Sequence, residues 1–306
     1  MKKKLLIIII PLLHFAAGLQ AQVARMPFEF DGKHLYIKIQ TPNSDTLRFA
    51  FDTGATSALI DSATAENAGV SKNNRQVVSV AGSGGAKDYT MAVNQTLKLS
   101  GVDIDGMDLI LMNFSQLSTR QNAKFDGIIG YEILNKYITH IDFDHLTLSL
   151  YNDIKETDTT GYTRIPFEFS RNVMIPRFPI SITLANKETF TGRVMFDTGA
   201  PYTLVVSTPF SKFHDFDSKL GKTTLTAGGG INAKTVDKLA TIKSMNFNGF
   251  NFDKMGIRLT VNENAEPRDG NLGILGNEII KRFNVILDYK NKVIYLKSNS
   301  LYQNKF

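Results

Sequence analysis

The stretch that decides the fold is Phe51-Asp52-Thr53-Gly54-Ala55, which returns as Phe196-Asp197-Thr198-Gly199-Ala200, 145 positions later. One Asp-Thr-Gly alone is a weak signal, since chance places it in on the order of a few per cent of chains of this length. Two copies, each at the end of an apolar segment, indicate a duplicated unit that supplies one carboxylate per half. Two carboxylates brought together are an established arrangement for acid–base chemistry.

Other landmarks recur at nearly the same offset. The glycine-rich segment 81–85 is answered by 227–230, and segment 126–133 by 272–279, in both cases 146 positions later. Two copies are too few for a solenoid or a propeller. The chain is therefore expected to contain an internal duplication that folds as two homologous lobes.

The boundary between the two lobes is predicted from a polar segment of the chain. The polar segment 152–161 separates the two sets of landmarks and is typical of a linker. The sequence predicts an N-terminal lobe over residues 22–155, with the first Asp-Thr-Gly, and a C-terminal lobe over residues 156–306, with the second.

The first 21 residues have the pattern of a secretory signal peptide. Met1-Lys2-Lys3-Lys4 precedes an apolar run over residues 5–15, and the small residues of 16–21 suit cleavage after Ala21. A membrane anchor is the alternative, but the run is too short for a spanning helix, and no later segment reaches 18 uninterrupted apolar residues. We expect an exported protein, periplasmic or extracellular, without stable insertion in a membrane.

Composition excludes several other classes. The chain has no cysteine, so disulfides and thiol nucleophiles are excluded, and its formal charge of +6 falls to +3 without the three signal lysines. No basic run interleaved with aromatic residues marks a nucleic-acid surface. The five histidines are scattered, without the spacing of a metal site. The sequence thus indicates no nucleic acid, no metal and no cofactor.

Short alternating or β-branched runs separated by Gly, Asn and Asp turns predict an all-β protein. Few helices are expected, all of them short, over residues 61–68, 132–137 and 278–283. Glu132 and Glu278 fall in first turns of the last two, where a carboxylate complements the helix dipole.

Each Asp-Thr-Gly is predicted to form a tight loop between two core strands. Gly54 and Gly199 allow the backbone to turn or another segment to approach closely. Thr53 and Thr198 carry hydroxyls that can bond backbone groups across the boundary between the lobes.

If the lobes face each other about a local two-fold axis, Asp52 and Asp197 meet at its centre. Two carboxylates that close cannot both ionise easily, so the pair should hold one shared proton. One group can then deprotonate a water molecule while the other protonates a carbonyl oxygen.

These residues carry a family resemblance. The chain resembles bilobal aspartic peptidases of the pepsin and retropepsin type, through both Asp-Thr-Gly triplets and through Ile128-Ile129-Gly130 and Ile274-Leu275-Gly276. The resemblance spans nearly the whole of residues 22–306. It implies the pepsin-like acid protease fold with two β-barrel-like lobes, catalysis by Asp52 and Asp197 on a shared water molecule, and a polypeptide substrate in the cleft between them.

The departures from pepsins resemble retropepsins. Ala55 and Ala200 stand where pepsins usually have Ser or Thr, and the glycine-rich hairpin Gly82 to Gly85 lacks the flap tyrosine of pepsins. We expect a flap or a plain hairpin turn in each lobe, with the candidate substrate-binding residues Gly82, Gly84, Gly85, Gly228, Gly229 and Gly230. Pro201 has no N–H group, so that position of the second lobe cannot donate a backbone hydrogen bond.

The expected function is that of an exported aspartic endopeptidase. Because one chain carries both carboxylates, a monomer is sufficient for the active site. The alternative is a catalytically inactive module that binds peptide or glycan on the same fold. Substrate identity and cleavage preference do not follow from the sequence.

Overall fold

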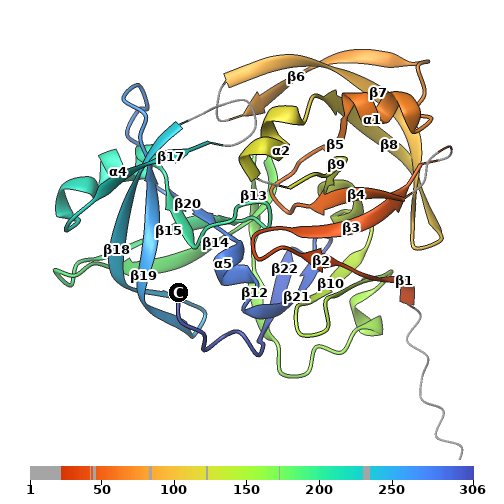
Figure 1. Ribbon diagram of the computed structural model, residues 1–306. Coiled ribbons are helices and arrows are strands. Elements are labelled where there is room, and N and C mark those ends of the chain that lie inside the picture. Colours follow the sequence, from red (N-terminus) through yellow and green to blue (C-terminus); the bar gives the residue numbers. More distant parts are fainter. Residues whose placement is uncertain are drawn as a thin grey trace, which may run out of the picture.

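A computed structural model of the 306-residue chain describes residues 22–41, 43, 46–82, 85–121, 123–171, 173–229 and 235–306. The expected signal peptide, residues 1–21, lies outside the described residues. The architecture is all-β with few short helices, as the sequence predicts (Figure 1).

The first lobe is built on an eight-stranded sheet. In spatial order its strands are β2 (Glu29–Phe30), β3 (Leu35–Gln40), β4 (Thr46–Phe51), β9 (Gly127–Ile129), β5 (Ala58–Asp61), β8 (Val102–Met112), β7 (Gly85–Leu99) and β6 (Arg75–Gly82). β3 also pairs with β7, which brings the two ends of the sheet together.

The second lobe is built on another eight-stranded sheet. In spatial order its strands are β13 (Glu168–Ser170), β14 (Val173–Thr183), β15 (Thr189–Phe196), β20 (Asn271–Leu275), β16 (Leu204–Val206), β19 (Phe250–Thr260), β18 (Thr235–Phe247) and β17 (Thr224–Gly228). Here β14 also pairs with β18. The strand order and the additional pairing are therefore the same in both lobes, strand for strand.

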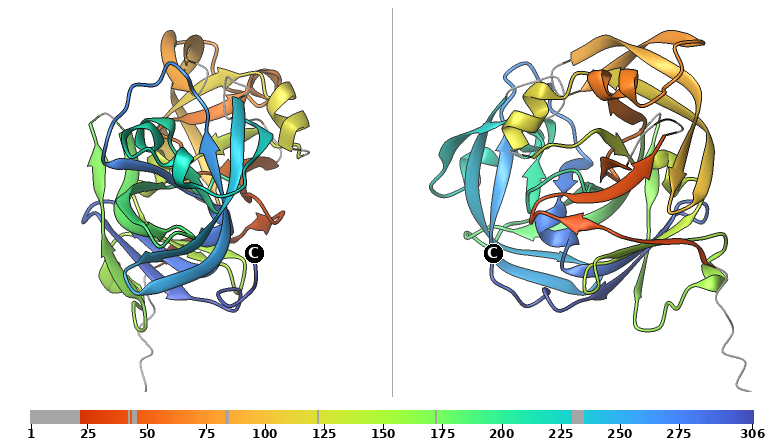
Figure 2. Two further views of the ribbon diagram at one scale, coloured as in Figure 1. Left: turned by 90° about the vertical axis from the view of Figure 1, so that its left-hand side faces the viewer. Right: turned by 45° about the vertical axis from the view of Figure 1, so that its right-hand side comes forward.

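A six-stranded sheet contains strands from both halves of the chain. Its spatial order is β1 (Gln22–Pro27), β11 (Thr147–Tyr151), β10 (Ile138–Asp142), β21 (Phe283–Asp288), β22 (Val293–Ser298) and β12 (Thr163–Pro166). β10 and β21 form the central antiparallel pair, with His140 opposite Ile286. This sheet lies in the lower central part of the molecule in Figure 1 and in the right-hand view of Figure 2, and its strands come from both halves of the chain.

The helices are short and cover sheet ends. They are α1 (Ser62–Asn67), α2 (Ser115–Gln121), α3 (Tyr131–Leu134), α4 (Thr208–Phe213) and α5 (Asn277–Ile280), with two 3-10 turns, Ile154–Glu156 and Asp217–Lys219. The sequence predicts α1, α3 and α5 but not α2 or α4. The predicted helix over 278–283 ends early, because Phe283 is buried and pairs with Ser298 as the first residue of β21.

Alternation of apolar and polar residues explains why these segments are strands. In β3, the buried Ile37 and Ile39 alternate with the exposed Lys38 and Gln40. The last strand residues before each Asp-Thr-Gly, Phe51 and Phe196, are about 1% exposed. One continuous core cluster contains residues from both lobes and from the shared sheet. The loops that follow Phe51 and Phe196 are therefore fixed to a packed interior on both sides.

Among the residues that the structure describes, no helix has the length and apolar character needed to cross a bilayer. Residue 155, where we predict that the N-terminal lobe ends, lies in the 3-10 turn Ile154–Glu156 between β11 and β12. The exact division stays a prediction.

Candidate active site

Both Asp-Thr-Gly triplets form the loop that leaves the third strand of a sheet. Asp52 follows β4, and its N–H donates to the Ile129 carbonyl of β9 at 2.9 Å. Asp197 follows β15, and its N–H donates to the Leu275 carbonyl of β20 at 3.1 Å. β9 and β20 end with the two hydrophobic residues of each motif, and the motif glycine follows directly. Each strand runs parallel to the strand that precedes the aspartate.

The two threonines lock the loops together across the lobe boundary. The Thr53 hydroxyl donates to the Phe196 carbonyl at 2.7 Å and accepts the Thr198 N–H at 3.0 Å. The Thr198 hydroxyl donates to the Phe51 carbonyl at 2.9 Å and accepts the Thr53 N–H at 3.0 Å. Both threonines are almost completely buried. Each hydroxyl thus uses its donor and an acceptor site on the opposite lobe.

The two glycines make room for the opposite carboxyl groups. A Cβ added to Gly54 would lie 2.5 Å from the Asp197 Cγ, and one added to Gly199 would collide in the same way with Asp52. Each glycine N–H donates to the aspartate of its own loop, Gly54 to Asp52 at 2.7 Å and Gly199 to Asp197 at 2.8 Å. Only glycine allows the two carboxyl groups to approach across the boundary.

Asp52 and Asp197 are half-buried and face each other across the lobe boundary as a pair of carboxyl groups. Burial raises the pKa of Asp52, although the neighbouring Asp197 carboxyl group and the Gly54 amide act in the opposite direction. Burial, and then the charge of Asp52, raise the pKa of Asp197 well above its ordinary value. The pair therefore carries one shared proton over the pH range between its two titrations. In that state it contains both a proton donor and a proton acceptor.

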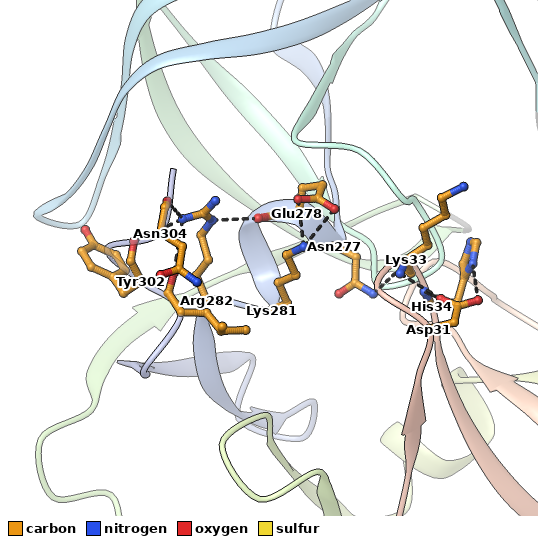
Figure 3. Close-up of polar contacts among 10 residues, drawn as sticks. Asp31, Lys33, His34, Asn277, Glu278, Lys281, Arg282, Tyr302 and Asn304 are labelled. Carbon is orange, nitrogen blue, oxygen red and sulfur yellow. Dashed lines mark hydrogen bonds and ion pairs between the residues drawn. The ribbon is translucent and has the colours of Figure 1, made fainter. Parts of the chain in front are cut away.

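A loop of the first lobe contacts the second lobe beside this pair. In Figure 3, Asn277 points from α5 toward this loop, and its side-chain amide donates to the Lys33 carbonyl at 2.8 Å. The Asn277 N–H also donates to the Ala200 carbonyl of the Asp197 loop at 2.7 Å. The neighbouring His34 is 4% exposed, and its Nδ1 lies 4.0 Å from Asp31 Oδ2.

Two further groups with raised pKa values are Glu132 and Tyr289. Glu132 accepts the Ala58 N–H at 2.5 Å, so it supports the strand after the Asp52 loop in addition to its place in the first turn of α3. Burial raises the pKa of Glu132. Tyr289 is buried, and its pKa is raised well above the ordinary value by burial and then by the charges of Asp52 and Asp197.

The glycine-rich hairpins lie at the ends of both sheets. Gly82 and Gly85 pair where β6 meets β7, and Gly228 ends β17 with Gly229 directly after it. Gly84 and Gly230 lie outside the described residues. Hairpins are thus present in both lobes, and their action as flaps stays a prediction.

A pocket of about 580 Å³ adjoins the loop after Asp197. Its lining includes Tyr202, Leu239, Arg258 and Glu278. The Arg258 guanidinium lies 4.0 Å from the centre of the Tyr202 ring and donates to Asp237 at 3.2 Å. In the first lobe, Leu59 of the strand after the active loop pairs with Ile110. In the second lobe, the equivalent residue Val205 pairs with Arg258. The two lobes therefore present different chemistry beside the carboxyl pair.

No cluster of His, Asp and Glu that could hold a metal ion occurs among the described residues. The sequence did not single out His34, Asn277 or Tyr289. His34 and Asn277 reach the site only because the lobes pack together, and the segment of His34 contains no motif. Asn277 had one weak signal, since it directly follows the glycine of the second repeated motif.

Comparison with known proteins gives one family. The aspartyl protease family matches residues 37–133, a range that runs from β3 into α3 and includes the Asp52 loop. No curated protein matches the chain. The match of the lobe that carries Asp52 supports assignment of the chain to the aspartic peptidases of the retropepsin type.

Proposed function

We propose that the protein is an aspartic endopeptidase whose catalytic residues are Asp52 and Asp197. One observation carries the proposal: one carboxyl group from each lobe lies at the lobe boundary, held by its own loop glycine and in close approach to the glycine of the opposite loop. Burying two acids together is costly unless they share a proton. This arrangement leaves one oxygen to accept a proton from water and one O–H to donate to a carbonyl group.

The reaction then needs no covalent intermediate. The ionised carboxylate takes a proton from a water molecule as the water oxygen attacks the peptide carbonyl carbon, and the other carboxyl group gives its proton to the carbonyl oxygen. The tetrahedral diol collapses when the carboxyl group that took the proton from water gives it to the amide nitrogen, the C–N bond breaks, and one diol hydroxyl gives its proton to the ionised carboxylate. The pair ends with one proton, as it began.

Thr53, Gly54, Thr198 and Gly199 support the active-site loops in this proposal. The threonine hydroxyls fix the distance between the loops, and the glycine amides orient one oxygen of each carboxyl group. The glycines of the two hairpins are candidates for substrate binding, since retropepsin-like enzymes close hairpins over the peptide.

Both carboxyl groups come from one chain, and the two sheets share one strand order. These facts support the proposals that the gene arose by internal duplication and that a monomer suffices for activity. Turnover per molecule is therefore expected to stay constant on dilution, while a steep fall that tracks loss of a dimer in sedimentation would contradict this.

The proposed location is outside the cytoplasm, periplasmic or extracellular, on the strength of the signal-like pattern of residues 1–21. The proposed substrate is a polypeptide. A module that binds peptide or glycan without catalysis would not need both carboxyl groups.

The test of the function is incubation of the folded protein with mixed unfolded proteins between about pH 3 and 8, with and without a pepstatin-type inhibitor. We expect cleavage that the inhibitor reduces. Absence of cleavage at every pH, from protein shown to be folded, would favour the binding module.

A further inference from the structure

His34 is a buried imidazole without a hydrogen bond. It is 4% exposed, and neither Nδ1 nor Nε2 has a hydrogen-bond partner among the described residues. Buried polar atoms are nearly always paired, so an unpaired buried ring calls for an explanation. Because no hydrogen bond fixes its protonation state, such a ring can gain or lose a proton in response to a nearby charge.

The position of His34 links the two lobes. It belongs to the loop between β2 and β3, which Asn277 holds through the Lys33 carbonyl at 2.8 Å. The same Asn277 holds the Asp197 loop through the Ala200 carbonyl. The loop that contains His34 and the loop that contains Gly199 are therefore held by the same residue. Figure 3 shows the ring next to Asp31, close to the contact between Lys33 and Asn277.

Several charged and polar groups face the ring. Asp31 and Asp52 of the first lobe and the Gly199 backbone of the second favour a charged imidazole, whereas Lys33 opposes it. Burial is the largest influence and lowers the pKa of His34 below its ordinary value. Tyr36 completes the surroundings, with its ring centre 6.2 Å from that of His34.

Asp31 is held as an anion. It accepts N–H groups from Lys33 at 2.8 Å and His34 at 2.7 Å, and the Tyr36 hydroxyl at 3.1 Å. Although burial raises the pKa of Asp31, these hydrogen bonds hold it below the ordinary value. A proton taken up by His34 would therefore lie between two carboxylates, Asp31 and Asp52.

The second lobe has no such group. Tyr36 pairs with Ala50, two residues before Asp52, and Arg177 pairs with Met195, two residues before Asp197. Two positions before Arg177 stands Ile175, the register equivalent of His34, which cannot bind a proton. Protonation at this position can thus favour only one member of the carboxyl pair.

We propose that His34 is a positioning residue of the carboxyl pair: by taking up a proton between Asp31 and Asp52 it keeps the negative charge of the pair on Asp52 and leaves the shared proton on Asp197. The inference takes its catalytic meaning from the proposed function. The titration that it requires, however, is a property of the folded protein alone. Asp52 would then be the group that accepts a proton from water, and Asp197 the group that donates to the carbonyl oxygen.

The first test is independent of activity. Linkage is reciprocal, so if protonated His34 stabilises the Asp52 carboxylate, the charge of the pair must raise the titration midpoint of His34 by the same amount. We would follow the imidazole signals by NMR in the wild type and in the double variant Asp52→Asn/Asp197→Asn. The His34 midpoint is expected to fall by about half a pH unit or more in the variant.

Two other histidines serve as internal controls. His140 contacts the Tyr162 hydroxyl at 2.9 Å, and His145 contacts Asp142 at 2.8 Å, both away from the pair. Their midpoints should stay unchanged. An unchanged His34 midpoint in the double variant would overturn the inference.

The second test is the pH–rate profile of His34→Gln, with His140→Gln as the matched control. Loss of a positive charge beside Asp52 makes its carboxylate harder to form, so the acidic limb should move up by about half a pH unit or more. A variant with a lower rate but unmoved limbs would show a purely structural role and contradict the inference. If the wild type cleaves no peptide, the proposed function fails, and the NMR titration still decides this inference.

Discussion

Two threonine hydroxyls hold the halves of the site together at the scale of single residues. The Thr198 hydroxyl donates to the Phe51 carbonyl and accepts the Thr53 N–H. Because both threonines are buried, water cannot replace either hydrogen bond if the hydroxyl is removed. Removing one hydroxyl therefore leaves a buried carbonyl and a buried N–H unpaired. Each such group costs about 1–3 kcal/mol.

Thr198→Val is expected to lower the free energy of unfolding by about 2 kcal/mol or more, because valine keeps the shape and removes both hydrogen bonds. Urea unfolding measures this value. Thr183→Val is the matched control, since its hydroxyl bonds Thr189 at the surface, and it should change stability by less than about 0.5 kcal/mol. Equal effects of the two substitutions would show that the cross-lobe hydroxyl contributes nothing special.

The pH dependence belongs to the same scale. Burial raises the pKa values of both Asp52 and Asp197, so both limbs of a pH–rate profile should lie above those of free carboxyl groups. Activity rises as the pair loses its first proton and falls as it loses the second. We expect a mildly acidic to near-neutral optimum.

Ala55→Ser tests the cause. A serine hydroxyl that donates to the Asp52 carboxylate stabilises the ionised form, so the acidic limb should move down by about half a pH unit. The measurement is kcat/KM against pH. The control is Ser57→Ala, which removes a nearby hydroxyl group. A limb that stays in place, or a wild-type optimum below about pH 3.5, would mean that other groups set the titration.

At the scale of elements, the second lobe differs from the first where Arg258 replaces Ile110. Arg258 of β19 donates to the Ala227 carbonyl of β17 at 3.1 Å and to Asp237 of β18 at 3.2 Å. Asp237 is 4% exposed. One side chain thus joins three strands at the base of the second hairpin.

Arg258→Met should therefore destabilise the fold, because it leaves the Asp237 carboxylate buried without its cation. Breaking a buried pair costs about 3–5 kcal/mol, and partial exposure of Arg258 reduces our expectation to about 2 kcal/mol. Adding Asp237→Asn should recover part of the loss. Arg193→Met is the control, since the ion pair of Arg193 with Glu168 is exposed. If Arg258→Met and Arg193→Met lowered the stability equally, the structural role given to Arg258 would be contradicted.

The sequence predicts elements well where the signal is local. Alternation is sufficient for β3, and the repeated triplets with their following glycine motifs are sufficient to place Asp52 and Asp197 on equivalent loops. Helix α4 was missed although Ser207 caps it and Pro209 stands in its first turn, because a six-residue helix has too short a periodic pattern. Phe283 was assigned to a helix because its pairing with Ser298 is not visible in the local pattern.

At the scale of the whole molecule, long-range pairing decides what the sequence does not reveal. β10 and β21 are neighbours in the shared sheet although about 145 residues separate them, and no local pattern encodes which strands meet. The same packing brings Asn277 to Lys33 and so joins the loop of His34 to the loop of Gly199. Motifs with a repeated partner could be predicted, whereas contacts made by unrepeated residues needed the structure.

The shared sheet also explains why a single chain can hold the pair in place. Three strands from the first half lie beside three strands from the second, and the halves meet where β10 pairs with β21. The core cluster continues from one lobe into the other. This continuity supports the proposal that a monomer suffices for the active site.

The most direct test is kcat/KM for an unfolded protein substrate with the wild type, Asp52→Asn and Asp197→Asn, each shown by circular dichroism to be folded. Asparagine keeps the shape but can neither share the proton nor act as a base, so each variant should lose about a hundredfold or more of the activity. Asp158→Asn, at an exposed position, should leave the activity unchanged. Retention of more than about a tenth of the wild-type value by either pair variant would contradict the account.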